Sequence, residues 1–204
     1  MAISEVDKKH VESLFPALNE IKDFSIREKV ITVWVEGLKD GNYDKIEDIA
    51  WMERQPWSNK YTWSLIDHTN QVTSCALAIA KFAKEVMAIE VNMDILIAGA
   101  CLHDVDKTVL CDAKTKERTD WYKKLPHGTY SAYMALKYEL PLDVAHILVS
   151  HTAFSAKRQQ TVEALIVHMA DYITADLRNL KEGVDFMFTA QAPHYFDGVI
   201  KLGT

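Results

Sequence analysis

The chain has 204 residues, of which 49% are hydrophobic and 25% are charged, so it can form one globular domain with a sizeable core. Its 7 glycines and 5 prolines are few for the many turns of a β-sandwich or barrel, and this favours helices. The formal charge of −6 argues against a nucleic-acid polymer or an anionic membrane surface as the partner. The longest strictly apolar run is too short to span a bilayer, so no membrane association is expected.

Cysteine usage and the start of the chain bear on the compartment. Cys75, Cys101 and Cys111 form no CxxC pair and would leave an odd thiol if two of them were bridged. The opening residues, MAISEVDKK, do not resemble a secretion signal. We therefore expect reduced cysteines and a cytoplasmic protein.

Residues 1–60 are expected to form an N-terminal helical extension. The segment IREKVITVWVEGLKDG has apolar residues at helical spacing and stops at Gly41, a plausible C-terminal glycine. Its β-branched cluster, ITVWV, also permits a strand. The segment DKIEDIAWMERQPW predicts a shorter helix that ends before Pro56.

Stronger helical patterns begin near Tyr61, and residues 61–185 are expected to form an all-α helical bundle, followed by a tail at 186–204. The segment WSLIDHTNQVTSCALAIAKFAKEV predicts a helix with one face formed by His68, Val72, Cys75 and Ile79. The next helix carries ILIAGACLHD and can be capped by Asn92 or Asp94.

The second half of the bundle follows the polar segment CDAKTKERTDWYKKLP, which is expected to be a loop. We predict helices from His127 to Pro141, from Pro141 to about His151, and over 160–181. Small residues would let these helices approach one another closely: Gly99, Ala132 and Ala135.

A wholly apolar stretch at 95–102, ILIAGACL, predicts a buried helix that ends directly in a His-Asp pair. Buried charges are costly unless they are paired or bind a metal. Comparable polar groups recur about once per helix, so that one bundle interior could collect them: His68, His103, Asp104, His127, His151 and Asp171. Each one alone has an ordinary structural explanation, such as a core histidine or a capping aspartate. The ordered set of histidine and carboxylate groups instead suits a borderline divalent cation.

This ordered pattern, H…HD…H…H…D, resembles the HD-domain superfamily of metal-dependent phosphohydrolases. The matching segments are IDHTNQV, CLHDVDK, PHGTYSA, VSHT and VHMADYI. The resemblance implies that one metal ion is held by His68, His103, Asp104 and Asp171. It implies a second ion, bridged by Asp104 and held by the pair found in the two-metal branch, His127 and His151. That branch includes the HD-GYP phosphodiesterases, but the Gly-Tyr-Pro signature is absent, which argues against cyclic di-GMP as the substrate.

Lys107, which follows the HD pair, has two interpretations. A lysine occupies this place in many members of the superfamily, and there it would hold a substrate phosphate as a point charge. Alternatively, it is a solvated charge at a helix C-terminus, favoured by the helix dipole. Asp106 is expected to be solvated or to support a ligand from outside the coordination sphere.

Other residues near these motifs are expected to have structural roles. His168 is interpreted as a core or supporting residue, and four basic residues as surface charges: Lys123, Lys124, Arg158 and Arg178. Three tryptophans precede His68, and they are core fillers first and candidates for a pocket mouth second: Trp51, Trp57 and Trp63.

The resemblance implies a hydrolase, either a phosphomonoesterase or a phosphodiesterase, acting on a small phosphate ester or nucleotide. Asp104 would hold two ions that activate a water molecule, while Lys107 steadies the developing charge. One or two divalent ions are expected, Fe or Mn first, with Zn, Ni or Mg as alternatives. Two rival hypotheses remain: a di-iron oxygenase of the same superfamily, and a non-catalytic ligand-sensing domain. The expected partner is a small phosphate-containing molecule, and the sequence leaves a homo-oligomer open.

Overall fold

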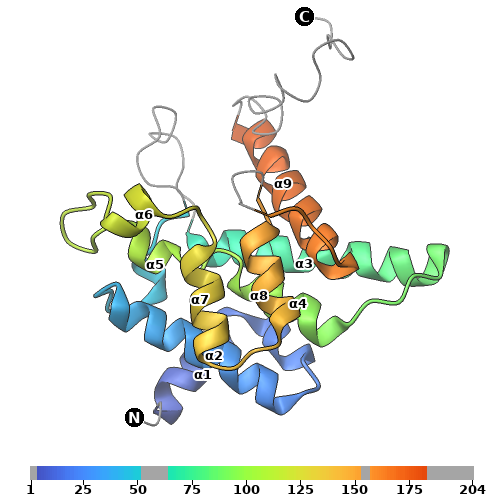
Figure 1. Ribbon diagram of the computed structural model, residues 1–204, viewed down its shortest axis with the longest axis horizontal. Coiled ribbons are helices and arrows are strands. Elements are labelled where there is room, and N and C mark those ends of the chain that lie inside the picture. Colours follow the sequence, from blue (N-terminus) through green and yellow to red (C-terminus); the bar gives the residue numbers. More distant parts are fainter. Residues whose placement is uncertain (1–3, 52–63, 153–156, 183–204) are drawn as a thin grey trace, which may run out of the picture.

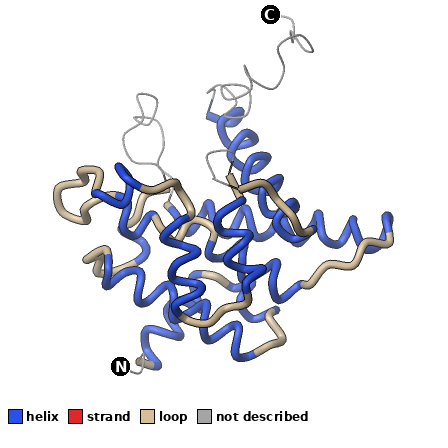
Figure 2. Tube along the Cα trace, in the orientation of Figure 1, coloured by secondary structure: helices blue, strands red, loops and turns tan. Residues whose placement is uncertain are grey.

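The computed structural model describes residues 4–51, 64–152 and 157–182. Over these ranges the regular structure consists of helices, and the only β-type contacts are two isolated bridges, Ala50 with Ser64 and Cys111 with Arg118 (Figures 1 and 2). The predicted all-α class is therefore confirmed. Within the same ranges, none of the helices has the length and apolar character needed to cross a bilayer.

The N-terminal part of the chain supplies two α-helices and two 3-10 helices: α1 (Glu5–Leu14), η1 (Pro16–Glu20), α2 (Phe24–Asp40) and η2 (Ile46–Asp48). α2 confirms the helical reading of IREKVITVWVEGLKDG, with Gly41 as its C-cap, and excludes the strand. The helix predicted over DKIEDIAWMERQPW is wrong for its described part, because regular structure there is limited to η2. The rest of that segment, with Trp57 and Trp63, lies outside the described residues.

The remaining helices follow from residue 65: α3 (Leu65–Met87), α4 (Met93–Leu102), α5 (Lys107–Leu110), α6 (Asp120–Lys124), α7 (Thr129–Lys137), α8 (Leu142–Ser150) and α9 (Val162–Glu182). Asn92 caps α4, since its side chain accepts a hydrogen bond from the backbone N–H of Ile95. The segment predicted as a polar loop contains the short helix α6. α7 begins two residues later than predicted because Gly128, with φ +84°, turns the chain before it.

α4 is the centre of the bundle, as its apolar sequence predicted. Every residue from 95 to 102 is buried, and α4 packs against α2, α3, α8 and α9. Gly99 permits the contact with α8, because a Cβ at this position would lie 2.5 Å from Cδ1 of Ile147. An ordinary side chain at residue 99 would therefore push the two helices apart. The close approach of α4 and α8 brings their C-terminal ends to one place.

The N-terminal helices share the core of the bundle. Trp34 on α2 is fully buried, stacks on Phe15 with ring centroids 4.8 Å apart, and donates a hydrogen bond from Nε1 to the carbonyl of Cys101. α2 thus supports the end of α4 from which the His-Asp pair emerges. The division into an extension at 1–60, a domain at 61–185 and a tail at 186–204 stays a prediction, and the tail lies outside the described residues.

Candidate metal centre

Six predicted side chains lie together around the C-terminal end of α4. They come from the first turn of α3, the end of α4 and the turn after it, the residue preceding Gly128, the end of α8 and the middle of α9: His68, His103, Asp104, His127, His151 and Asp171. Five of them are buried, and the sixth, His127, has a side chain that is 23% exposed. Their ligand-type atoms form two groups of three, and within each group these atoms lie within 4.8 Å of one another.

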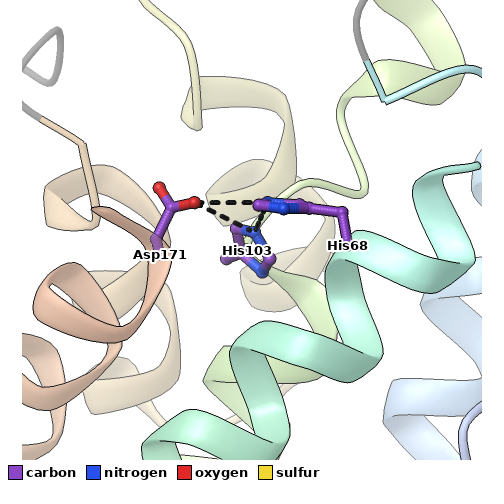
Figure 3. Close-up of side chains that lie close together, drawn as sticks. All are labelled: His68, His103 and Asp171. Carbon is purple, nitrogen blue, oxygen red and sulfur yellow. Dashed lines mark hydrogen bonds and ion pairs between the residues drawn. The ribbon is translucent and has the colours of Figure 1, made fainter. Parts of the chain in front are cut away.

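The first group contains His68, His103 and Asp171 (Figure 3). Nε2 of His68 lies 3.0 Å from Nε2 of His103 and 3.2 Å from Oδ1 of Asp171. The same carboxylate oxygen lies 4.0 Å from Nε2 of His103. All three polar atoms therefore point toward one small space between α3, α4 and α9.

The second group contains Asp104, His127 and His151. Nε2 of His127 lies 2.9 Å from Oδ1 of Asp104 and 3.2 Å from Nε2 of His151. Nε2 of His151 lies 3.8 Å from the same Oδ1. This group has the same composition as the first, namely two imidazoles and one carboxylate.

Asp104 connects the two groups through its two carboxylate oxygens. Oδ1 faces the second group, while Oδ2 faces the first, at 3.4 Å from Nε2 of His68 and 3.6 Å from Nε2 of His103. A carboxylate in this orientation can bridge two cations, with one oxygen for each. The geometry therefore suits a binuclear centre with a shared aspartate.

Hydrogen bonds at Nδ1 turn the Nε2 lone pairs of three histidines inward. Nδ1 of His103 donates to the carbonyl of Ala100 at 2.7 Å, and Nδ1 of His151 donates to the carbonyl of Leu148 at 2.9 Å. Nδ1 of His127 donates to a carboxylate oxygen of Asp106 at 2.8 Å. In a neutral imidazole, a proton fixed on Nδ1 leaves Nε2 as an acceptor, as metal-ligating histidines require. Acceptor atoms then face one another at close range, and a cation between them would relieve that repulsion.

Asp106 is a supporting residue that the sequence identified only as one of two alternatives. It is 1% exposed, so the solvated alternative is wrong. Its Oδ2 accepts hydrogen bonds from His127 and from the backbone N–H of Gly128. Its own backbone N–H donates to Oγ of Ser131. A carboxylate behind an imidazole fixes the ring and increases its basicity, which strengthens a metal bond on the opposite nitrogen.

The carboxylates leave an excess of negative charge in the centre. Burial by itself would raise the pKa of Asp104, but Lys107 and the neighbouring histidines hold it well below its ordinary range. Burial is likewise outweighed at Asp171, where His68 lowers the pKa, and at Asp106, where His127 does so. Three buried carboxylates thus lie near the ammonium of Lys107, which pairs with Asp104. Divalent cations would balance this charge, which is otherwise costly to bury.

Burial and the neighbouring charges shift the pKa values of the histidines in opposite directions. Burial lowers the pKa of His68, and burial together with the nearby histidines lowers that of His151 to about 4, so both rings are neutral and able to ligate. At His127, burial opposes the charged form, but Asp106 and Asp104 outweigh it and raise the pKa to about 10. A metal ion bound to Nε2 of His127 would take the place of the second ring proton that these carboxylates favour.

Lys107 lies beside the bridging carboxylate. Its Nζ is 3.5 Å from Oδ2 of Asp104, and its side chain is 19% exposed. Burial works against its charge, yet Asp104, Asp106 and Asp171 raise its pKa, so the ammonium is retained. The alternative of a solvated charge does not fit, because the Lys107 side chain is only 19% exposed and lies beside Asp104. Its partly open position lets it contact a substrate anion as well as Asp104.

The other candidates from the sequence lie around the centre rather than in it. Nδ1 of His168 donates to the carbonyl of His151 at 2.7 Å, which supports that part of the chain. Trp51 is buried, and its ring lies 4.4 Å from that of His68. Arg178 lines a groove of about 550 Å³ between α3 and α9. Three basic residues are exposed, as expected: Lys123, Lys124 and Arg158.

Comparison with known proteins identifies the class. Residues 65–176, from the start of α3 into α9, match the HD domain family. The match spans more than half of the chain, so the protein belongs to the HD domain family, and the predicted resemblance is confirmed.

A curated relative narrows this class. The dihydroneopterin 2′,3′-cyclic phosphate phosphodiesterase of Methanocaldococcus jannaschii is 34% identical over 168 residues. The aligned region covers 79% of this chain and 67% of the relative. No solved structure matches the chain significantly.

Proposed function

We propose that the protein is a metal-dependent phosphodiesterase that opens a cyclic phosphate ester of a small polar molecule. The broader class, an HD-domain phosphohydrolase, is confirmed by the family and by the relative. The cyclic ester is inferred from the relative, which is a dihydroneopterin 2′,3′-cyclic phosphate phosphodiesterase. The proposed metal ligands are the six residues of the two groups: His68, His103, Asp104, His127, His151 and Asp171.

The position of Asp104 is the observation that carries the proposal. Its Oδ2 faces the first group, its Oδ1 faces the two histidines of the second, and hydrogen bonds at Nδ1 orient three of the four imidazoles. When bound, two divalent ions would lower the pKa of water and neutralise charge on a phosphate. A silent ligand-sensing domain has no need of this complete and buried donor set.

The reaction is hydrolysis at phosphorus. Water adds to phosphorus, one of the two ester P–O bonds of the ring breaks, and the product is a phosphomonoester with a free hydroxyl. Lys107 would hold a phosphate oxygen, since it is the cation next to the bridging carboxylate. Asp106 would keep the His127 ring in place through its hydrogen bond to Nδ1.

Several finer features belong to the same proposal. The donor set of imidazole and carboxylate suits Fe(II) or Mn(II), with Zn, Ni and Mg as alternatives. The substrate is a small molecule, consistent with the acidic chain and with the relative. A cytoplasmic location is part of the same proposal, supported by the free thiols of Cys75, Cys101 and Cys111.

The experiment is a hydrolysis assay on the full chain, purified without oxygen and loaded with Fe(II) or Mn(II). Dihydroneopterin 2′,3′-cyclic phosphate, a 2′,3′-cyclic nucleotide and a phosphomonoester are compared by ³¹P NMR, with Asp104→Asn as the control. We expect the cyclic phosphate signal to give way to that of a monoester, in the wild type alone. Oxygen uptake coupled to substrate loss, without hydrolysis of any phosphate, would instead establish the oxygenase. A protein that binds no divalent metal would establish the non-catalytic domain.

A further inference from the structure

Lys107 lies on a helix that is too short to fix its own position. α5 has only four residues, and no side chain caps its N-terminus with a hydrogen bond. A single helical turn is unstable alone, because its few backbone hydrogen bonds do not offset the entropy lost in forming it. The ammonium of Lys107 nevertheless lies 3.5 Å from Oδ2 of Asp104. The segments that pack around α5 must therefore determine where this ammonium lies.

The C-terminal end of α2 packs directly on α5, and glycine occupies two of the positions where they meet (Figure 1). A Cβ at residue 41 would overlap the carbonyl oxygen of Thr108 and lie 2.7 Å from its carbonyl carbon. A Cβ at residue 37 would lie 3.3 Å from Oγ1 of Thr108 and 3.5 Å from Cγ2 of Val105. Gly37 and Gly41 thus form a flat surface on which the residue after Lys107 packs.

Thr108 cannot move on this surface without moving the backbone of α5. It is fully buried, and its Oγ1 donates a hydrogen bond to the carbonyl of Val105 at 2.8 Å. Close-packed interiors transmit a displacement to the next group instead of absorbing it. Because Lys107 precedes Thr108 in the chain, a shift of Thr108 is passed to Lys107.

A hydrogen bond between α7 and α2 holds the same region from a second side. The buried hydroxyl of Tyr130 donates to Oδ2 of Asp40 at 2.8 Å. Burial and Asp40 raise the pKa of this hydroxyl, so it keeps the proton that it donates. The next residue of α7, Ser131, accepts at Oγ a hydrogen bond from the backbone N–H of Asp106 at 3.1 Å. The turn that leads into α5 is therefore held between α2 and α7.

We propose that the two glycines of α2 hold Thr108 in place and thereby keep the Lys107 ammonium beside Asp104. Gly37 and Gly41 are positioning residues, since they act through Thr108. The effect on catalysis rests on the proposed function, in which Lys107 holds a phosphate oxygen. α2 lies outside residues 65–176, the part of the chain that matches the HD domain family. The N-terminal helices would thus belong to the architecture of the active site.

Gly37→Ala is the first test, because the added methyl group would displace Thr108 by a few tenths of an ångström. We expect kcat/KM for the cyclic phosphate to fall by about three- to tenfold, since a misplacement of about 1 Å costs roughly a hundred-fold. Metal content and the circular dichroism spectrum should be unchanged. Lys39→Ala is the matched control, because Lys39 lies in the last turn of α2 and its side chain is 57% exposed. It should behave as wild type.

Two double variants separate the positioning of Lys107 from a general effect on the fold. In Gly37→Ala/Thr108→Ala, the Thr108 atoms nearest to the new methyl group are gone, so this variant should match Thr108→Ala. In a Lys107→Ala background, Gly37→Ala should cause no further loss, because no ammonium remains to be misplaced. A full loss from Gly37→Ala in either background would overturn the proposal.

The chemical reactivity of Lys107 tests its position without substrate or metal. Reductive methylation of the full chain with formaldehyde and cyanoborohydride, followed by mass spectrometry of peptides, measures the rate at each lysine. In the wild type, Lys107 should react more slowly than the exposed Lys123, because it is 19% exposed and paired with Asp104. Gly37→Ala should raise the rate at Lys107 and leave the rate at Lys123 unchanged.

The two measurements distinguish failure of this proposal from failure of the proposed function. An unchanged methylation rate at Lys107 in Gly37→Ala would overturn the positioning role, whatever the wild type hydrolyses. A raised rate with unchanged kcat/KM would show that the position of Lys107 has no effect on catalysis, and would overturn the proposal as well. A raised rate in a protein whose wild type hydrolyses none of the phosphates would support the positioning role and refute the proposed function.

Discussion

The two groups of the candidate centre have the same donor atoms but are held in different ways. His68 of the first group is fully buried under the ring of Trp51, and its Nδ1 has no hydrogen-bond partner among the described residues. His127 of the second group is 23% exposed and is oriented by a hydrogen bond to Asp106. Packing thus orients one ring, and a buried carboxylate orients the other.

This difference indicates which of the two groups would hold its metal ion tightly and which would exchange it. A histidine held by close packing cannot turn without disturbing the core. A histidine that is partly exposed and hydrogen-bonded can release its metal ion and leave room for substrate. We therefore expect the first ion to be the tightly held one and the second to be the exchangeable one. Substitution of Asp104, which faces both groups, is the strongest test of this comparison.

The largest effect is expected for Asp104→Ala, which removes the carboxylate that faces both groups. The second group would keep only its two histidines, and the first group would lose the fourth donor that Oδ2 of Asp104 supplies, so both ions should be lost. Hydrolysis should fall by more than a hundred-fold, since loss of a supporting residue alone costs about ten- to a hundred-fold. Metal analysis after dialysis, with the circular dichroism spectrum as a folding control, measures this. If one ion per chain remained, Asp104 would not be shared.

The next effect separates the groups. His127→Ala should release the second ion and keep the first, while His68→Ala should release the first. A chelator titration of the wild type should accordingly remove one ion per chain well before the other, because the His127 side is partly exposed. Metal content that falls in a single step, or that is unchanged in His127→Ala, would contradict the division into two unequal sites.

Lys107→Ala should change catalysis without changing the metal content. Loss of a charge-assisted contact with a phosphate oxygen costs about 1.5–3 kcal/mol, or roughly ten- to a hundred-fold in kcat/KM. Lys107→Arg should restore little of this loss, because a planar guanidinium does not replace a compact ammonium. Lys123→Ala, on an exposed lysine of α6, is the control and should behave as wild type. Wild-type kinetics in both Lys107 variants would remove it from the site.

The smallest effect is expected for Asp106→Asn, which keeps the shape of the side chain but weakens its support of His127. The affinity for the second ion should fall by about ten- to a hundred-fold, and saturating metal should restore most of the activity. The first ion should be unaffected. Asp112→Asn, on an aspartate exposed in the same segment, should leave both affinities unchanged. Equal weakening of both ions would show that Asp106 acts on the whole bundle.

The sequence by itself determined the helical class and the order of the polar groups, because both depend on local signals. Apolar periodicity identified α2, α3 and α9, and the uninterrupted run at 95–102 identified the buried α4. The histidines and aspartates stood out because they interrupt or end those apolar patterns. The HD family followed from their order along the chain. The weakest predictions were at short elements such as η2 and α6, where few residues carry any periodicity.

Tertiary structure alone decided how those groups face one another. The orientation of Asp104 between two trios depends on where α3, α8 and α9 cross α4, and contacts such as Gly99 against Ile147 set those crossings. The hydrogen bond from His127 to Asp106 joins residues 21 positions apart, across α5, α6 and connecting segments whose path no local pattern specifies. The exposure of apolar side chains such as Leu165 and Leu177 on α9 is equally non-local, since an amphipathic helix does not reveal which face its neighbours cover. Periodicity is a property of one segment, whereas distances and burial arise only when segments pack.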